Sequence, residues 1–382
     1  MGTAVSKFKS FGFRGLLVVC ALGLGVSCST LAKRNDTGVV VANRAEIRSS
    51  TAVVAADLLK VNRGDTVDIL DAQDVQDPTD NTKKERWLRV RAHDEDSTEG
   101  WIESRNVMPD EVLQNSKRLA EEDKDVPTQA SGQLRASSNL RLTPDRSGNE
   151  NIMMRLDSGS SFDIVGWKRV PKPKSSEEIE SDVAPKAGSA QPGSSRVKGD
   201  QEDQPEDSNE LWYKVRLPSL ISPAPAGWIY GKQVELKVPS DIIFYRTGRE
   251  FVAWQRLDGE ATEADGSSKK DAARDGKPGS WVILEKSSSN QPRTIDEPEF
   301  DRIYVLGYDK RDQEHYTAYR SPDLKGYLPF RIEGRLDNRT FTIRVLDESG
   351  QVKDVQYGVY KDARGYLRVS APGAGRENEK KK

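Results

Sequence analysis

Cysteine and histidine are almost absent from this chain, and their scarcity excludes several common catalytic chemistries. The 382 residues contain two cysteines, Cys20 and Cys28, and two histidines, His93 and His315. A cysteine peptidase pairs a thiol with an imidazole, and zinc hydrolases usually take two or three ligands from histidine. Two isolated histidines supply neither set, so we expect structural roles for both. We predict a protein that is not an enzyme and binds no metal or other cofactor.

An excess of positive charge is also missing. Lysine and arginine number 59 against 61 acidic residues, which gives a formal net charge of -2. In addition, no glycine-rich loop leads from a strand into a helix, as phosphate-binding loops do. We therefore expect neither a nucleic-acid partner nor a bound nucleotide.

Long apolar segments are lacking, except near the N-terminus. Lys7, Lys9 and Arg14 precede the apolar run 16–25. This run is about half of the ~20 residues that a membrane-spanning helix needs. A basic start followed by a short apolar run is typical of a secretory signal peptide, which we predict for residues 1–27.

The run ends in Leu24-Gly25-Val26-Ser27-Cys28-Ser29. This segment resembles the lipobox of bacterial lipoproteins, although a large aliphatic residue is usual where Gly25 stands. The resemblance implies cleavage after Ser27, lipidation of Cys28 and a membrane anchor at the outer membrane or cell surface. A soluble periplasmic protein is the alternative. Cys20 would leave with the signal, so the mature chain could form no internal disulfide.

Two later segments repeat the same order of short motifs. Each has a short motif ending in Arg, a turn before an alternating strand, a strand that begins with Trp, and a Gly-Trp-Ile element. In the first copy these are 46–48, 63–70, 87–91 and 100–102; in the second they are 139–141, 158–165, 212–216 and 227–229. Alternating apolar residues and β-branched side chains between turn formers predict about five short strands per copy.

The repeated pattern resembles the bacterial Src-homology-3 (SH3) domain, which implies two small barrels. By this resemblance, Gly100-Trp101 and Gly227-Trp228 close the barrels, and we expect both tryptophans in the cores. Four other aromatic residues begin or flank exposed strands and are the ligand-binding candidates: Trp87, Trp212, Tyr213 and Tyr230.

We therefore predict an all-β protein: two SH3-like barrels followed by an antiparallel β domain, either a barrel or a sandwich. The predicted segments are a signal peptide at 1–27, a tether at 28–41, a first barrel at 42–112 and a charged linker at 113–132. A second barrel at 133–236 carries a disordered insertion at 172–209, rich in Pro, Ser and acidic residues. The C-terminal β domain occupies 237–372, and 373–382 form a disordered tail.

The leading hypothesis for function is a non-catalytic binding or scaffolding lipoprotein that contacts peptidoglycan or its peptides. A second hypothesis is an adaptor that recruits another envelope protein. A third is a carboxylate-dependent hydrolase in the C-terminal domain, which would use acids such as those that we place near one strand end: Asp301, Asp309, Asp312 and Glu314.

Overall fold

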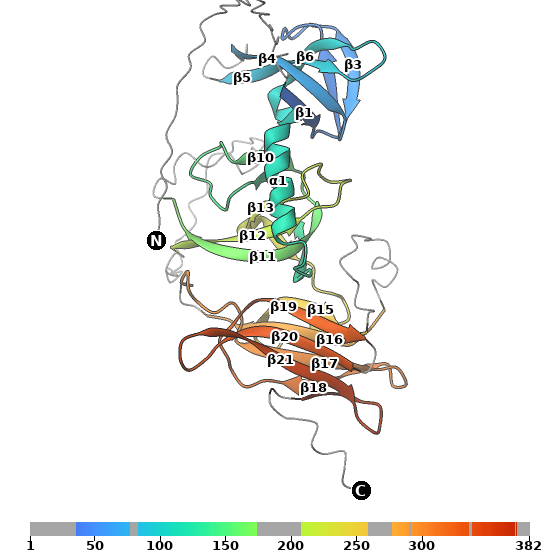
Figure 1. The fold of residues 1–382 in the computed structure, drawn as a ribbon, viewed down its shortest axis with the longest axis vertical. Coiled ribbons are helices and arrows are strands. Elements are labelled where there is room, and N and C mark those ends of the chain that lie inside the picture. The colour runs from blue at the N-terminus through green and yellow to red at the C-terminus, as the bar shows by residue number, and fades with distance from the viewer. Residues whose placement is uncertain are drawn as a thin grey trace, which may run out of the picture. The chain divides into compact units, whose positions relative to one another are not determined.

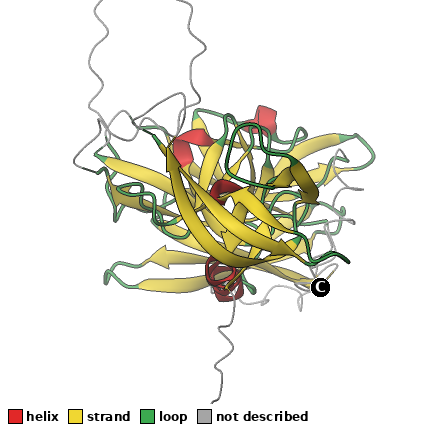
Figure 2. Cartoon of the chain, turned by 90° about the horizontal axis from the view of Figure 1, so that it is seen from above, coloured by secondary structure: helices red, strands yellow, loops and turns green. Residues whose placement is uncertain are grey.

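The computed structural model describes residues 36–76, 83–173, 208–258, 277–289, 292–335, 338–370 and 372. The described residues from Asp36 onward belong to one unit. The predicted signal peptide, Cys28, the C-terminal tail and nearly all of the predicted insertion lie outside the described residues. Strands make up most of the described chain (Figure 2), which confirms the all-β prediction.

The first sheet, sheet A, is antiparallel and has the strand order β3-β2-β6-β5-β4-β1-β7. Its strands are labelled in Figure 1 where there is room: β1 (Asp36–Val40), β2 (Arg44–Arg48), β3 (Asp57–Asn62), β4 (Thr66–Gln76), β5 (Lys84–Ala92), β6 (Glu99–Glu103) and β7 (Val107–Pro109). A 3-10 turn, η1 (Ser104–Asn106), connects β6 to β7. Val40, Ile47, Val67, Val90 and Ile102 are buried in its core.

The second sheet, sheet B, repeats this arrangement strand for strand. Its order is β10-β9-β13-β12-β11-β8-β14, and the 3-10 turn η3 (Gly231–Gln233) again precedes the last strand. The strands are β8 (Ala130–Leu134), β9 (Ser138–Arg141), β10 (Ile152–Leu156), β11 (Ser161–Pro171), β12 (Asn209–Arg216), β13 (Ala226–Tyr230) and β14 (Val234–Leu236). The repeated motifs therefore occupy corresponding strands of two sheets with one topology.

Close packing inside both sheets depends on glycines at matching places. A Cβ atom on Gly38 of β1 would lie 2.6 Å from Val107 Cγ1, and one on Gly132 of β8 would lie 2.7 Å from Phe162 Cε2. Both glycines are the third residue of the first strand in their sheet. A larger residue would push that strand away from its neighbours, because real Cβ contacts are not this short.

The α-helix α1 (Asp110–Glu122) follows β7 directly and packs on sheet B through a buried serine. Ser116 Oγ donates a hydrogen bond to the carbonyl oxygen of Ala226 (2.6 Å) and accepts one from its N–H (3.2 Å). Just after the helix, Arg216 Nη2 donates to the carbonyl oxygens of Asp123 and Val126. These bonds satisfy polar groups that burial would otherwise leave without partners.

Two four-stranded antiparallel sheets complete the fold. Sheet C contains β15 (Arg249–Arg256), β16 (Trp281–Ser287), β17 (Arg302–Asp309) and β18 (Glu314–Arg320) in chain order. Sheet D contains β19 (Gly326–Arg335), β20 (Asn338–Leu346), β21 (Val352–Lys361) and β22 (Leu367–Ser370), also in chain order. One apolar cluster joins side chains of both sheets, including Leu284, Val305, Phe330 and Phe341, so the pair forms a sandwich.

Gln129 connects sheets B, C and D. Its N–H donates to Ile164 of β11 and its carbonyl oxygen accepts from the N–H of Trp254 on β15, both at 2.8 Å. Its side chain accepts from the N–H of Phe330 on β19 (2.9 Å) and donates to the carbonyl oxygen of Phe330 (3.1 Å). Because Gln129 is fully buried, the loss of these bonds would leave polar groups unpaired away from water.

Several predicted boundaries are wrong. Residues 36–40 of the predicted tether form β1, and the predicted linker 113–132 includes the start of β8. A helix within this linker fits the charged composition of residues 117–122, but α1 begins earlier, at Asp110. The predicted C-terminal β domain starts with the 3-10 turn η4 (Ile243–Tyr245) and not with a strand. There the N–H groups of Ile242 and Ile243 both bond the carbonyl oxygen of Pro239, which closes a turn instead of extending the chain.

Candidate functional site

The loop between β9 and β10 of sheet B is held in one shape by a buried arginine. Arg141 is 2% exposed, and its Nη1 donates to the carbonyl oxygen of Gly148 (2.6 Å) and to Asn151 Oδ1 (2.7 Å). Asp145 Oδ1 accepts from the N–H of Ser147 at 2.8 Å. Hydrogen bonds from Ser147, backbone first and then hydroxyl, lower the pKa of Asp145. The arginine of the Asn-Leu-Arg motif thus shapes this loop.

This loop positions Arg146 at a cluster of charged and aromatic groups. The Arg146 guanidinium pairs with the Glu210 carboxylate through Nε (3.0 Å) and Nη2 (2.6 Å) to Oε1. It also lies 4.7 Å from the ring centre of Tyr230, whose ring packs 5.5 Å from that of Trp212. We name Arg146, Glu210, Trp212 and Tyr230 the sheet B cluster. A two-point ion pair and a cation–π contact fix the guanidinium in place.

Burial sets the electrostatics of the sheet B cluster. The Glu210 side chain is 2% exposed, so its charge depends on Arg146 for compensation. Burial, and next the nearby Glu210 charge, raise the pKa of Tyr230. Trp212 Nε1 is buried and has no hydrogen-bond partner among the described residues. The cluster therefore combines a fixed cation, two aromatic rings and one unused indole donor.

Sheet A has a different set of groups at the matching positions. Arg48 donates to the carbonyl oxygens of Val53 and Ala55 in the loop after β2, and it lies 5.9 Å from the ring centre of Trp87. Glu103 replaces Tyr230, and it accepts a hydrogen bond from Arg105 at 2.6 Å. The arginine that shapes the loop is kept, whereas the second aromatic residue and its stacked cation are absent at these positions.

The exposures expected for the tryptophans are wrong in both sheets. Trp87 is 5% exposed and Trp212 is fully buried, although both were expected to be partly exposed. Trp101 and Trp228 were expected in the cores but are only half-buried. On each strand the glycine before the tryptophan and the isoleucine after it face the core. Successive side chains alternate between faces, so each tryptophan points outward.

The glycines of these elements allow close contact with a neighbouring strand. A Cβ on Gly100 would lie 2.5 Å from the Arg48 carbonyl oxygen, and one on Gly227 would lie 2.7 Å from Leu140 Cδ1. Tyr213, another ligand-binding candidate, points to the opposite face of its strand from Trp212. Its ring centre lies 6.1 Å from that of Trp167. Burial raises the pKa of Tyr213 to about 12. The structure therefore brings Trp212 and Tyr230 together and leaves Tyr213 and Trp87 elsewhere.

The two histidines lie in different surroundings. His93 Nε2 is 2.9 Å from Asp68 Oδ1 at the surface of sheet A. His315 is enclosed between Tyr245 and Tyr308, with Nε2 2.8 Å from the carbonyl oxygen of Gly279. Both contacts position the ring, and neither pairs the imidazole with a nucleophile.

Of the four acids considered for hydrolysis, Asp309, Asp312 and Glu314 lie at the turn between β17 and β18, whereas Asp301 does not. Asp301 precedes β17 and Asp309 ends it, which places them roughly 25 Å apart along an extended strand. Asp301 pairs with Arg249 and accepts from the N–H of Ser287, while Asp309 accepts from the N–H of Arg311. Carboxylate pairs that cleave glycosides lie within about 10 Å. The predicted grouping is therefore wrong for Asp301 and confirmed for the other three acids.

The most deeply buried acid among the described residues is not one of the candidates from the sequence. Glu285 is fully buried, and its two carboxylate oxygens have no hydrogen-bond partner among the described residues. Burial raises the pKa of Glu285, and the charges of Arg320, Arg249 and Arg302 oppose this effect. Its burial could have been predicted from its position directly after the apolar run Trp281–Leu284, because a charged residue there continues a buried strand.

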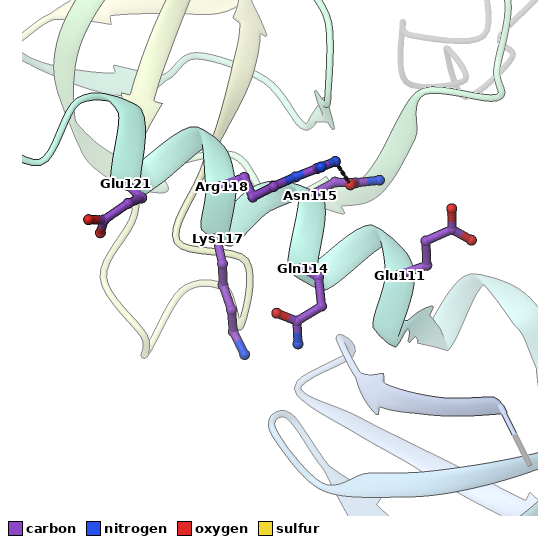
Figure 3. Close-up of a pocket in the computed structure, with 6 residues that line it drawn as sticks. All are labelled: Glu111, Gln114, Asn115, Lys117, Arg118 and Glu121. Carbon is purple, nitrogen blue, oxygen red and sulfur yellow. Dashed lines mark hydrogen bonds between the residues drawn. The ribbon is translucent and has the colours of Figure 1, made fainter. Parts of the chain in front are cut away.

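The outer face of α1 carries a shallow hollow of about 700 Å³ that is lined by polar residues of the helix alone (Figure 3). Figure 3 shows Gln114 and Lys117 pointing away from the helix side by side, while Arg118 bonds Asn115. Glu111 and Glu121 complete the lining. Two acids and two bases on one exposed helix face give no net charge and no apolar anchor for a ligand.

No group of three or more His, Cys, Asp or Glu residues in the described ranges could hold a metal ion. Within the same ranges, no helix is both long and apolar enough to cross a membrane.

No family model and no curated protein matches this chain. Among solved structures, NlpC1 from Trichomonas vaginalis is 11% identical and covers 91% of this chain and 98% of its own, with a TM-score of 0.15. NlpC2 from the same organism is 9% identical, with coverages of 88% and 92% and the same TM-score. A TM-score this low supports no conclusion about fold or function.

Proposed function

We propose that this protein is a non-catalytic, lipid-anchored binding protein of a bacterial cell envelope, with two SH3-like barrels formed by sheets A and B. The anchor is inferred from the sequence around Cys28, and the barrels from the SH3-like motifs and the shared strand order of the two sheets. We further propose that sheet B contacts peptidoglycan or its peptides at the sheet B cluster.

The fixed position of Arg146 carries the binding proposal. Binding is stronger when the groups that contact a ligand are already held in place, because less conformational entropy is lost on association. Arg141 fixes the loop, and Glu210 and Tyr230 fix the guanidinium that the loop presents. A guanidinium beside aromatic rings suits both the carboxylates of a peptide and the faces of a sugar.

Cosedimentation of the mature protein with purified cell-wall sacculi tests this proposal. We expect wild-type protein to sediment and Arg146→Lys to bind about tenfold less, because lysine keeps the charge near Glu210 but cannot form the two-point pair. Arg105→Lys is the matched control in sheet A, where the side chain is 71% exposed, and it should bind normally. A folded wild-type protein that stays in solution would refute the peptidoglycan proposal.

The anchor is tested separately. The intact mass of membrane-extracted protein should exceed the polypeptide mass by acyl chains, and Cys28→Ser should abolish the excess and release the protein from the membrane fraction. Unmodified wild-type protein in the soluble periplasm would refute the anchor and leave the binding proposal intact.

A further inference from the structure

A bulge in β19 of sheet D forms a hollow on the outer face of the sandwich. Tyr327 stands opposite Arg344 of β20, and Arg331 stands opposite Thr342. Three residues of β19, from Leu328 to Phe330, therefore face the single residue Ile343. Extra residues on one strand displace it from its partner. The hollow has a volume of about 420 Å³, which is within the range of small-molecule sites.

Hydrogen bonds hold the bulge from both sides. The N–H of Leu328 donates to the Glu299 carboxylate. The carbonyl oxygen of Leu328 accepts from Arg344 Nη1 at 3.1 Å. Next in the chain, both main-chain polar groups of Phe330 bond the Gln129 side chain. The floor of the hollow is thus fixed before any ligand arrives.

The rim of the hollow carries charges of both signs. It is lined by Pro329, Arg331, Glu333, Thr342, Arg344 and Asp354. Arg331, Arg344 and Asp354 are exposed. Within the described residues, the side chains of Arg331, Glu333 and Asp354 form no hydrogen bond or ion pair, although Asp354 stands directly opposite Arg344 on the neighbouring strand. These groups are therefore available to a ligand.

We propose that this hollow binds a zwitterionic ligand of the size of a short peptide, with its carboxylate on Arg331 and Arg344 and its ammonium group on Asp354. Arginine pairs with a carboxylate through two parallel hydrogen bonds, and an ammonium group donates three to oxygen acceptors. The site belongs to sheet D and does not depend on the sheet B cluster.

The dipeptide alanyl-glutamate is a suitable probe, because at neutral pH it has one ammonium group and two carboxylates. Titration of the mature protein, followed by NMR of ¹⁵N-labelled amides, should give saturable shifts in β19–β21. N-acetylation of the probe should weaken binding about tenfold, because it removes the ammonium charge. Amidation of its carboxylates should have a similar effect.

Paired variants assign each end of the probe. Arg331→Gln should weaken the binding of alanyl-glutamate about tenfold. Asp354→Asn should remove the difference in affinity between the free and the N-acetylated probe. Exposed residues in nearby turns supply the controls Arg364→Gln and Glu348→Gln, which should bind normally. Circular dichroism checks that all four variants fold. An absence of saturable shifts, or equal loss in the control variants, would overturn the proposal.

Discussion

Sheets A and B share one strand order, but the side chains on their longest pair of neighbouring strands differ. In sheet A, β4 and β5 carry acids opposite arginines, with Asp68, Asp71 and Asp74 facing Arg91, Arg89 and Arg86. In sheet B, the corresponding pair β11 and β12 places Trp167 opposite Tyr213, and both rings pack against apolar clusters that include sheet C. Arg89 and Arg91 form their ion pairs with Glu99 of β6. Charged side chains thus suit an exposed ribbon, whereas an aromatic pair suits a covered one. Duplicated topology thus leaves the surface chemistry free to change.

The largest loss of stability should come from a substitution of Gln129, which has no counterpart among the described residues before sheet A. Gln129→Ala leaves the N–H of Phe330 buried and unpaired and removes one of the two donors to its carbonyl oxygen, the other being Gln255 Nε2. We expect the free energy of unfolding to fall by about 3–4 kcal/mol. Hydrogen exchange should accelerate in β8, β15 and β19 and stay unchanged in β2–β6. Gln133→Ala, in the same segment, is the matched control and should cost less than about 1 kcal/mol. Equal losses in both variants would contradict the role of Gln129.

The next largest effect compares the two arginines that shape loops. Arg141→Met removes two short hydrogen bonds from a fully enclosed group, so unfolding should become easier by about 3 kcal/mol. Arg48→Met should cost about 1 kcal/mol, because Arg48 is more accessible and water can replace its bonds. Urea unfolding of both variants measures the difference. A larger loss for Arg48 would reverse our view of which loop is rigid.

A smaller effect tests which sheet holds α1. Ser116→Ala removes the hydroxyl that bonds both main-chain groups of Ala226, and should cost about 1–2 kcal/mol. Faster hydrogen exchange should follow in α1 and β13, and not in β4 or β5. Lys117→Ala, on the outer face of the same helix, should leave stability and exchange within error of wild type.

The smallest effect concerns acid stability and should be alike in both sheets. The hydroxyl and then the N–H of Thr98 lower the pKa of Asp94 in sheet A, as Ser147 does for Asp145 in sheet B. A lowered folded-state pKa stabilises the fold above the unfolded value of 3.8, and this contribution is lost as the pH falls through the folded value. Asp94→Asn and Asp145→Asn should each be slightly less stable at pH 6, and the differences should shrink towards pH 2. Differences that grow in acid would contradict the assignment.

The repeated order of the motifs correctly predicted that the two copies have corresponding strands. The all-β class follows from alternating apolar residues and is confirmed. The matching glycines Gly38 and Gly132 mark one more strand per copy, but the repeated motifs begin only at Glu46, so the sequence predicts a tether where β1 lies. A short strand without an aromatic residue gives a weak pattern, and only its partners in the sheet define it.

The faces of the tryptophans could have been predicted from the glycine before each one. Hydrophobicity alone does not decide between Trp101 and Ile102, because both are apolar. Gly100 must face the adjacent strand, however, since a Cβ would meet Arg48 there. Its neighbour must then face outward. The sheet B cluster had no such signal, because Arg146 and Glu210 are far apart in the chain and meet only through the fold.

The contacts of Gln129 also determine how this chain could be shortened or recombined. A fragment that begins at residue 237 would retain Phe330 and Trp254 but lose the side chain and carbonyl oxygen that pair with them. The sandwich should then be expressed as a soluble product only when residues from about 127 onward accompany it. If parts of this chain are exchanged with those of another protein, sheet B and the sandwich should therefore be transferred together, whereas sheet A can be replaced on its own.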